Sequence, residues 1–173
     1  MKFNPCIVQT TFQSPLGKII IAATDKGLAG LWFDGQKHLP AELAGPAVWP
    51  RDPDHPVLQE VIRQLTGYFS GQRSSFDVPL DLAYGTAFQQ SVWQALLKIP
   101  QGGTASYGEV SQRIGKPAAV RAVGAAVGRN PVSIIVPCHR VMGAGGELTG
   151  YAGGLERKSA LLKLEGVALE GAQ

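Results

Sequence analysis

The feature that most constrains this chain is residues 132–141, where an apolar, largely β-branched run is followed at once by Pro137, Cys138 and His139. The run at 132–136 predicts a short buried strand. Pro137 has no N–H and cannot continue a central strand, so Cys138 is expected just past the strand end, where a rigid scaffold can present a side chain.

Two interpretations of this cysteine stay open on these residues alone. A thiolate is the nucleophilic form of cysteine, and a nearby imidazole favours it. Because adjacent side chains tend to point to opposite sides, we expect Cys138 and His139 to be coupled through a turn or one bridging water. The alternative is that Cys138 is a small buried hydrophobe and His139 a hydrogen-bonded core histidine.

Charge is distributed unevenly along the 173 residues. Residues 1–84 carry seven Lys/Arg and eight Asp/Glu, a net of −1, whereas residues 85–173 carry nine and five, a net of +4. The basic excess therefore lies in the half that holds the reactive motif, which favours a polyanionic partner. We divide the chain accordingly into an N-terminal α/β domain with its connector, 1–84, and a C-terminal domain, 85–173.

Composition excludes several classes of protein. The sequence has no run of 18 apolar residues and no apolar signal-peptide core, so we expect no membrane association. Cys6 and Cys138 are too far apart in sequence to suggest a disulfide framework, and thiol chemistry suits a reducing cytoplasm. The three histidines show no metal-ligand spacing, so we expect no metal and no cofactor.

The N-terminal half predicts a small antiparallel sheet followed by a helix. Residues 7–12, 17–24 and 28–33 have strand composition and are separated by turn residues at 14–17 and 25–27. Residues 35–53 are expected to form a loop. Apolar residues then recur at helical spacing over 55–69, and Gly71 ends this helix. Residues 73–84 are expected to form a connector with some extended character.

The C-terminal half predicts four helices. Thr86 with Gln89, and Ser106 with Glu109, form two capping-box patterns that begin helices. A third helix is expected over 118–127 and a last one over 155–165. The second and third suit a helix-turn-helix unit or an ordinary αα-hairpin. The glycine-rich segment 143–154, which carries Tyr151, is either a flexible loop or a lid over a pocket.

The motif at 137–141, Pro-Cys-His-Arg-Val, resembles the active-site motif of the O6-alkylguanine-DNA alkyltransferases. The chain is most similar to the bacterial type of this family. Further segments match the family in order and near-identical spacing: Ser106-Tyr107-Gly108, Arg121-Ala122-Val123-Gly124, Asn130-Pro131, Gly150-Tyr151-Ala152-Gly153-Gly154 and Leu164-Glu165-Gly166. The resemblance covers about residues 84–166, whereas the N-terminal half is similar only loosely.

The resemblance implies an α/β (α+β) fold: an N-terminal antiparallel sheet with a helix, ribonuclease H-like, and a mainly helical C-terminal domain with a helix-turn-helix. It implies repair of double-stranded DNA bound through the minor groove, by a monomer. The alkyl group of O6-alkylguanine, with O4-alkylthymine as a second candidate, would move irreversibly to Cys138 after the base is flipped out. Without a second cysteine nearby to resolve the thioether, each molecule would act once.

The resemblance also assigns roles to individual residues. Cys138, His139 and Glu165 would form a relay through a water, Asn130 would brace the turn, and Tyr107 would rotate a phosphate and donate a proton. Arg121 would fill the place of the extruded base. The full sets are Cys138, His139, Glu165, Tyr107 and Asn130 for catalysis; Arg121, Ala119, Val120, Ser106 and Tyr107 for DNA; and Pro137, Val141, Tyr151, Ala152, Gly153 and Trp93 for the pocket.

Two positions depart from some relatives. Ala152 stands where some carry a serine, so a hydroxyl contact to O6 is lost while a backbone N–H remains. Ser133 stands where some carry a proline, which changes the space for large adducts.

Two rival functions fit part of this sequence. A Cys-His-Glu hydrolase would turn over through a thioester, but it leaves Arg121 and the basic helices unexplained. A non-catalytic sensor of alkyl damage would not need Cys138.

Overall fold

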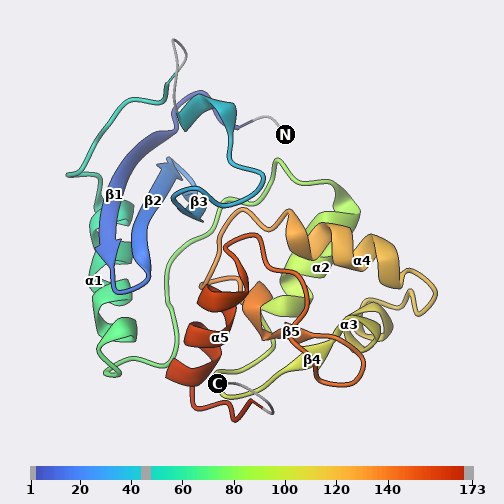
Figure 1. The fold of residues 1–173 in the computed structure, drawn as a ribbon. Coiled ribbons are helices and arrows are strands. Elements are labelled where there is room, and N and C mark those ends of the chain that lie inside the picture. The colour runs from blue at the N-terminus through green and yellow to red at the C-terminus, as the bar shows by residue number, and fades with distance from the viewer. Residues whose placement is uncertain (1–2, 44–47, 170–173) are drawn as a thin grey trace. The chain divides into compact units, whose positions relative to one another are not determined.

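The computed structural model describes residues 3–43 and 48–169, and it divides into two compact units, Met1–Tyr84 and Gly85–Gln173 (Figure 1). Among the described residues, no helix is both long enough and apolar enough to cross a membrane.

The first unit is built on a three-stranded antiparallel sheet. Its strands are β1 (Val8–Ser14), β2 (Gly17–Thr24) and β3 (Gly27–Phe33), in the order β1-β2-β3. The register pairs Ser14 with Gly17 at the first turn and Thr24 with Gly27 at the second. These are the turn positions that the sequence indicated, so the predicted meander is confirmed.

Both faces of this sheet are covered. Side chains alternate between the two faces of a strand. Ile20, Ala22 and Trp32 belong to an apolar cluster with Ile7, Ala29 and Trp49. Helix α1 (Pro56–Phe69) contacts all three strands, and its buried Leu58, Val61 and Leu65 pack against the sheet. This two-sided burial explains why β2 and β3 are apolar almost throughout.

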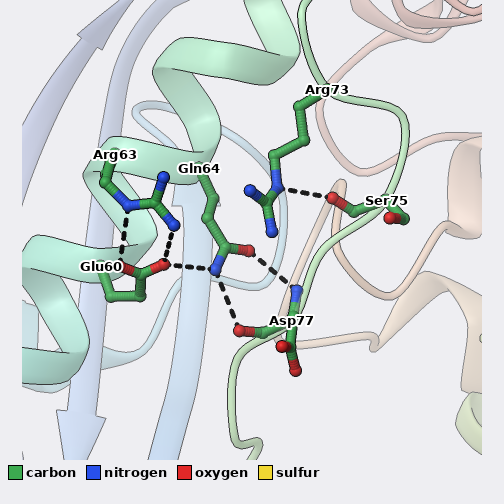
Figure 2. A network of polar contacts seen from close by, with 6 residues as sticks. All are labelled: Glu60, Arg63, Gln64, Arg73, Ser75 and Asp77. Atoms are coloured by element: carbon green, nitrogen blue, oxygen red, sulfur yellow. Dashed lines mark hydrogen bonds and ion pairs between the residues drawn. The ribbon is translucent and has the colours of Figure 1, made fainter.

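The connector after α1 is fastened to both the helix and the sheet. The side-chain amide of Gln64, which is 1% exposed, pairs with the backbone N–H and C=O of Asp77 at 2.8 and 2.9 Å (Figure 2). Leu80 then forms a parallel bridge with Leu28 of β3. The expected extended character is therefore local, and it arises from pairing with the sheet edge. The preceding loop also contains a short 3-10 turn, η1 (Ala41–Leu43).

The second unit contains helices α2 (Ala87–Leu96), α3 (Tyr107–Arg113), α4 (Val120–Gly128) and α5 (Leu155–Leu164). Strands β4 (Ala105–Ser106) and β5 (Val141–Met142) pair in parallel. Both capping boxes form: Thr86 and Ser106 each accept a hydrogen bond from the backbone N–H three residues on.

Helices α2, α3 and α4 pack against one another, and residues 114–119 join α3 to α4. The two short helices joined by a brief turn fit both alternatives that the sequence left open, a helix-turn-helix unit and an αα-hairpin. The indole N–H of Trp93 donates to the carbonyl of Ala126 at 2.9 Å, which ties α2 to α4. Because the Trp93 side chain is fully buried, its packing sets how α4 is held.

The predicted strand at 132–136 is wrong. Ile134 has a φ of 70°, and the N–H of Val136 donates to the carbonyl of Val132 at 3.0 Å, so the segment is a buried turn. The side chain of Asn130 makes the backbone hydrogen bonds that a neighbouring strand would otherwise make with this turn. Its Oδ1 accepts from Val132 N–H at 3.0 Å, and its Nδ2 donates to Val136 C=O at 2.8 Å. Burial required apolar residues here, but it did not require an extended backbone.

Candidate active site

Cys138 begins a short 3-10 helix, η2 (Cys138–Arg140), directly after the buried turn. Its N–H donates to the carbonyl of Val136 at 2.8 Å, and the residue is 6% exposed. Pro137 ends the turn, so the cysteine is held by the backbone that Asn130 braces. Asn130 thus contacts the backbone on which Cys138 is held, and its role in catalysis stays a prediction.

Burial raises the pKa of the Cys138 thiol above its usual value, because a thiolate is poorly solvated there. A hydrogen bond from Asn130 and the positive charge of Lys158 oppose this effect without cancelling it. The cysteine is consequently a neutral thiol at physiological pH, and a nearby base is needed to form the thiolate.

His139 and Glu165 form a buried pair. The ring Nε2 of His139 lies 2.7 Å from Oε2 of Glu165, and both side chains are fully inaccessible. Burial lowers the pKa of His139, although the hydrogen bond to Glu165 works in the opposite direction. An ionised carboxylate can only accept, so the neutral ring carries its proton on Nε2, and Nδ1 is left as an acceptor. Nδ1 has no hydrogen-bond partner within the described part of the chain.

Arg140 fixes the carboxylate from the other side. Its Nε and Nη2 donate to the two oxygens of Glu165 at 2.7 and 3.0 Å, and its Nη1 donates to the carbonyl of Ile99 at 2.6 Å. A guanidinium matches a carboxylate in this two-point manner. The charge on Glu165 is thereby compensated inside the protein, and its orientation toward His139 is set. Sequence reasoning quoted Arg140 in the motif but gave it no role.

Lys158 is the second residue that sequence reasoning missed. It lies in the middle of α5 and is fully buried, and its Nζ donates to the carbonyls of Val141, Thr149 and Gly150 at 2.6, 2.7 and 3.3 Å. Burial lowers its pKa to about 8. No sequence signal separated it from the exposed Lys163 of the same helix.

The predicted pocket residues lie in two environments. Tyr151, Ala152 and Gly153 are half-buried in the glycine-rich loop, next to the carbonyls that Lys158 holds. Pro137, Val141 and Trp93 are buried, and Trp93 belongs to the α2–α4 core. Their contact with a substrate stays a prediction.

The predicted nucleic-acid-binding residues lie at the start of α3 and α4. Arg121 is exposed in the first turn of α4, and its neighbour Val120 is 40% exposed. Ala119 caps that helix without a side-chain hydrogen bond, which leaves backbone N–H groups available to an anion. Ser106 caps α3, and Tyr107 is half-buried with its hydroxyl 3.4 Å from the carbonyl of Thr149. The start of α4 therefore combines an exposed arginine, small residues and a helix N-terminus.

Within the described residues, no group of three or more His, Cys, Asp or Glu side chains could hold a metal ion. A buried cysteine thus directly precedes a histidine that a carboxylate orients, in a unit that also carries two short packed helices with an exposed arginine. This combination is typical of proteins with a cysteine nucleophile.

Comparison with known proteins gives the family. Residues 7–82 match the model of the 6-O-methylguanine DNA methyltransferase ribonuclease-like domain, and residues 87–167 match that of the DNA binding domain of the same proteins. The chain belongs to the 6-O-methylguanine DNA methyltransferase family.

Similar proteins come from bacteria and archaea. The methylated-DNA--protein-cysteine methyltransferase of Mycobacterium tuberculosis H37Rv is 50% identical over 155 residues, 90% of each chain. That of Methanosarcina acetivorans is 50% identical over 156 residues, 90% of this chain and 96% of its own. The crystal structure of M. tuberculosis OGT in complex with DNA matches with a TM-score of 0.80, 49% identity and 90% coverage of both chains.

Proposed function

We propose that this protein repairs DNA by moving the alkyl group of O6-alkylguanine to its own Cys138, once per molecule. The observation that carries the proposal is Nδ1 of His139, which has no hydrogen-bond partner among the described residues. Glu165 holds the other nitrogen of this ring, and Cys138 is the preceding residue. The names of its relatives and the DNA complex of M. tuberculosis OGT support the same activity.

In the proposed step, the thiol proton of Cys138 passes through one water to Nδ1 of His139. The sulfur then attacks the alkyl carbon, an S–C bond forms, and the C–O6 bond breaks. The electron pair returns to guanine, which is protonated as it leaves, with the Tyr107 hydroxyl as donor. Because the product is a thioether, whose C–S bond is not broken by thiol–disulfide exchange, the thiol is not regenerated.

DNA would be engaged through the second unit, residues 85–173. The target atom lies inside the base stack, so the nucleotide must leave the duplex at a cost of a few kcal/mol. Arg121 is exposed among alanines that are too short to reach the stack, which suits it to fill the vacated place. We assign α4 to the minor groove, where base readout is degenerate, because repair must act at any guanine.

We further propose that the protein acts as a monomer in the cytoplasm, where a reducing environment keeps Cys138 free. O4-alkylthymine is a second candidate substrate for the same chemistry.

The test is intact-protein mass spectrometry after mixing with duplex DNA that contains one O6-methylguanine. We expect a permanent gain of one methyl group, located on Cys138 by peptide analysis, with one guanine restored per protein. Cys138→Ser should bind DNA within a few-fold of wild type and gain no mass. Repeated turnover would instead indicate the hydrolase, and binding without a mass change would indicate the sensor.

A further inference from the structure

Lys158 joins three segments of the active-site unit through one atom. Its Nζ reaches Val141, which directly follows η2, and Thr149 and Gly150, which precede Tyr151 in the glycine-rich loop. The Tyr107 hydroxyl shares the carbonyl of Thr149. One buried ammonium group therefore links the loop to the nucleophile segment, and Tyr107 at the start of α3 contacts the same loop.

A buried ammonium group is unfavourable unless hydrogen bonds compensate for the loss of its hydration. An ammonium has three N–H donors, and all three find backbone carbonyls here. A neutral amine has two donors and would leave one of the three carbonyls without its hydrogen bond. Since the glycines at 150 and 154 have positive φ, the loop backbone has little intrinsic preference for this shape, and the lysine supplies the constraint.

We propose that Lys158 is a positioning residue for alkyl transfer, which clamps the Tyr151–Ala152–Gly153 wall of the pocket against the Cys138 segment and presents its positive charge to the sulfur. This inference rests on the proposed function. It predicts two separate effects of the lysine, one on the geometry of the pocket and one on the ionisation of the thiol.

The positive charge of Lys158 acts on both Cys138 and His139. It lowers the pKa of the Cys138 thiol, and it also lowers that of His139, which disfavours a second cation beside it. Glu165 raises the pKa of His139 and Arg140 lowers it, and the Tyr107 hydroxyl contacts the carbonyl of Thr149 that Lys158 also binds. Lys158 thus favours the thiolate form of Cys138, and it favours the neutral form of His139 that is able to receive the thiol proton.

The experiment compares Lys158→Met, Lys158→Gln and Lys158→Arg with Lys163→Met, which removes an exposed lysine from the same helix. Single-turnover transfer from duplex O6-methylguanine is measured as a function of protein concentration. We expect Met and Gln to lower the maximal rate at least ten-fold while half-saturation stays within three-fold, because α4 is untouched. Arg should recover part of the rate, and Lys163→Met should match wild type.

A second readout separates positioning from folding. In a Cys6→Ser background, the rate of Cys138 alkylation by iodoacetamide is followed against pH. The midpoint should move to higher pH in Met and Gln, and stay near wild type in Arg. A purely structural lysine would reduce the fraction of active molecules and leave both the rate of the remainder and the thiol midpoint unchanged.

The outcomes distinguish this inference from the proposed function. If wild type transfers no alkyl group, the proposed function fails. If wild type transfers and Lys158→Met has the same rate and thiol midpoint, only the role of Lys158 fails. Loss of folding in all three variants, with Lys163→Met folded, would make Lys158 a structural residue and would also overturn the inference.

Discussion

Hydrogen bonds from Arg140 and His139 hold the carboxylate of Glu165. Glu165→Gln would weaken the bond that fixes the His139 tautomer, because an amide can present its N–H group to the ring instead of an oxygen. We expect single-turnover transfer at neutral pH to slow at least ten-fold, which corresponds to about 1.4 kcal/mol.

The pH dependence of this variant is informative because burial raises the pKa of Cys138. As pH rises, the thiol ionises without help from the relay, so the rate of Glu165→Gln should partly recover. Glu156→Gln, an exposed change at the other end of α5, is the control. A rate equal to wild type at every pH would remove Glu165 from the mechanism.

The side chain of Asn130 makes the hydrogen bonds that a neighbouring strand would otherwise make, so its removal should destabilise the protein. Asn130→Ala would leave the buried N–H of Val132 and C=O of Val136 without their side-chain partner. We expect the free energy of unfolding to fall by about 2–4 kcal/mol, measured by urea titration. Asn130→Asp keeps the acceptor and loses only the donor, so it tests which half matters. A change below about 0.5 kcal/mol in Asn130→Ala would contradict this account.

At the scale of elements, α4 presents two exposed arginines, Arg121 in its first turn and Arg129 at its C-terminal cap. If Arg121 fills the stack, Arg121→Ala leaves the cost of base extrusion uncompensated. We expect at least a ten-fold slower reaction on duplex DNA, roughly the effect of 1.4 kcal/mol, and near-normal reaction with free O6-benzylguanine if that base is accepted.

The matched control is Arg129→Ala, which removes the same charge from the other end of the helix. Equal losses of Arg121→Ala on both substrates would mean that Arg121 shapes the pocket or the fold. A loss of affinity alone, with a salt slope lower by about one unit, would make it an ordinary phosphate contact.

At the scale of the whole molecule, stability should depend on pH through His139. Because burial lowers its folded-state pKa, the unfolded chain takes up a proton below about pH 6.5 that the folded chain does not. Stability is therefore complete above that value and falls as the pH drops, by up to about 1.4 kcal/mol per pH unit.

Urea unfolding between about pH 7 and pH 5 measures this dependence. Glu60 affects stability only at lower pH. The hydrogen bond from Arg63 lowers the pKa of Glu60 from 4.5 to about 2 (Figure 2). The stability contributed by the ionised carboxylate is therefore lost as the pH falls from about 4.5 toward about 2. A stability that is constant from pH 7 to 5 would mean that His139 takes up its proton in the folded protein at the same pH as in the unfolded chain, which would contradict this account.

The sequence by itself determined the elements whose signals are local. Strand composition and turn residues predicted β1, β2 and β3, and side-chain spacing predicted α1. The capping boxes at Thr86 and Ser106 placed the starts of α2 and α3, because a cap is a contact between residues three positions apart. The motif around Cys138 indicated the family for the same reason, since its residues are contiguous.

Only the tertiary structure decided the contacts that join distant segments. An apolar run at 132–136 fits a buried strand or a buried turn equally well, and the choice depended on Asn130, whose amide takes the place of a sheet neighbour. Glu165 and Lys158 are residue types that normally lie on the solvated face of a helix, yet both are buried here. Their partners lie on η2, β5 and the glycine-rich loop, 8 to 26 positions away in sequence. A charge is buried only where the fold supplies its counter-groups, and that supply is a property of packing, which no local pattern of residues records.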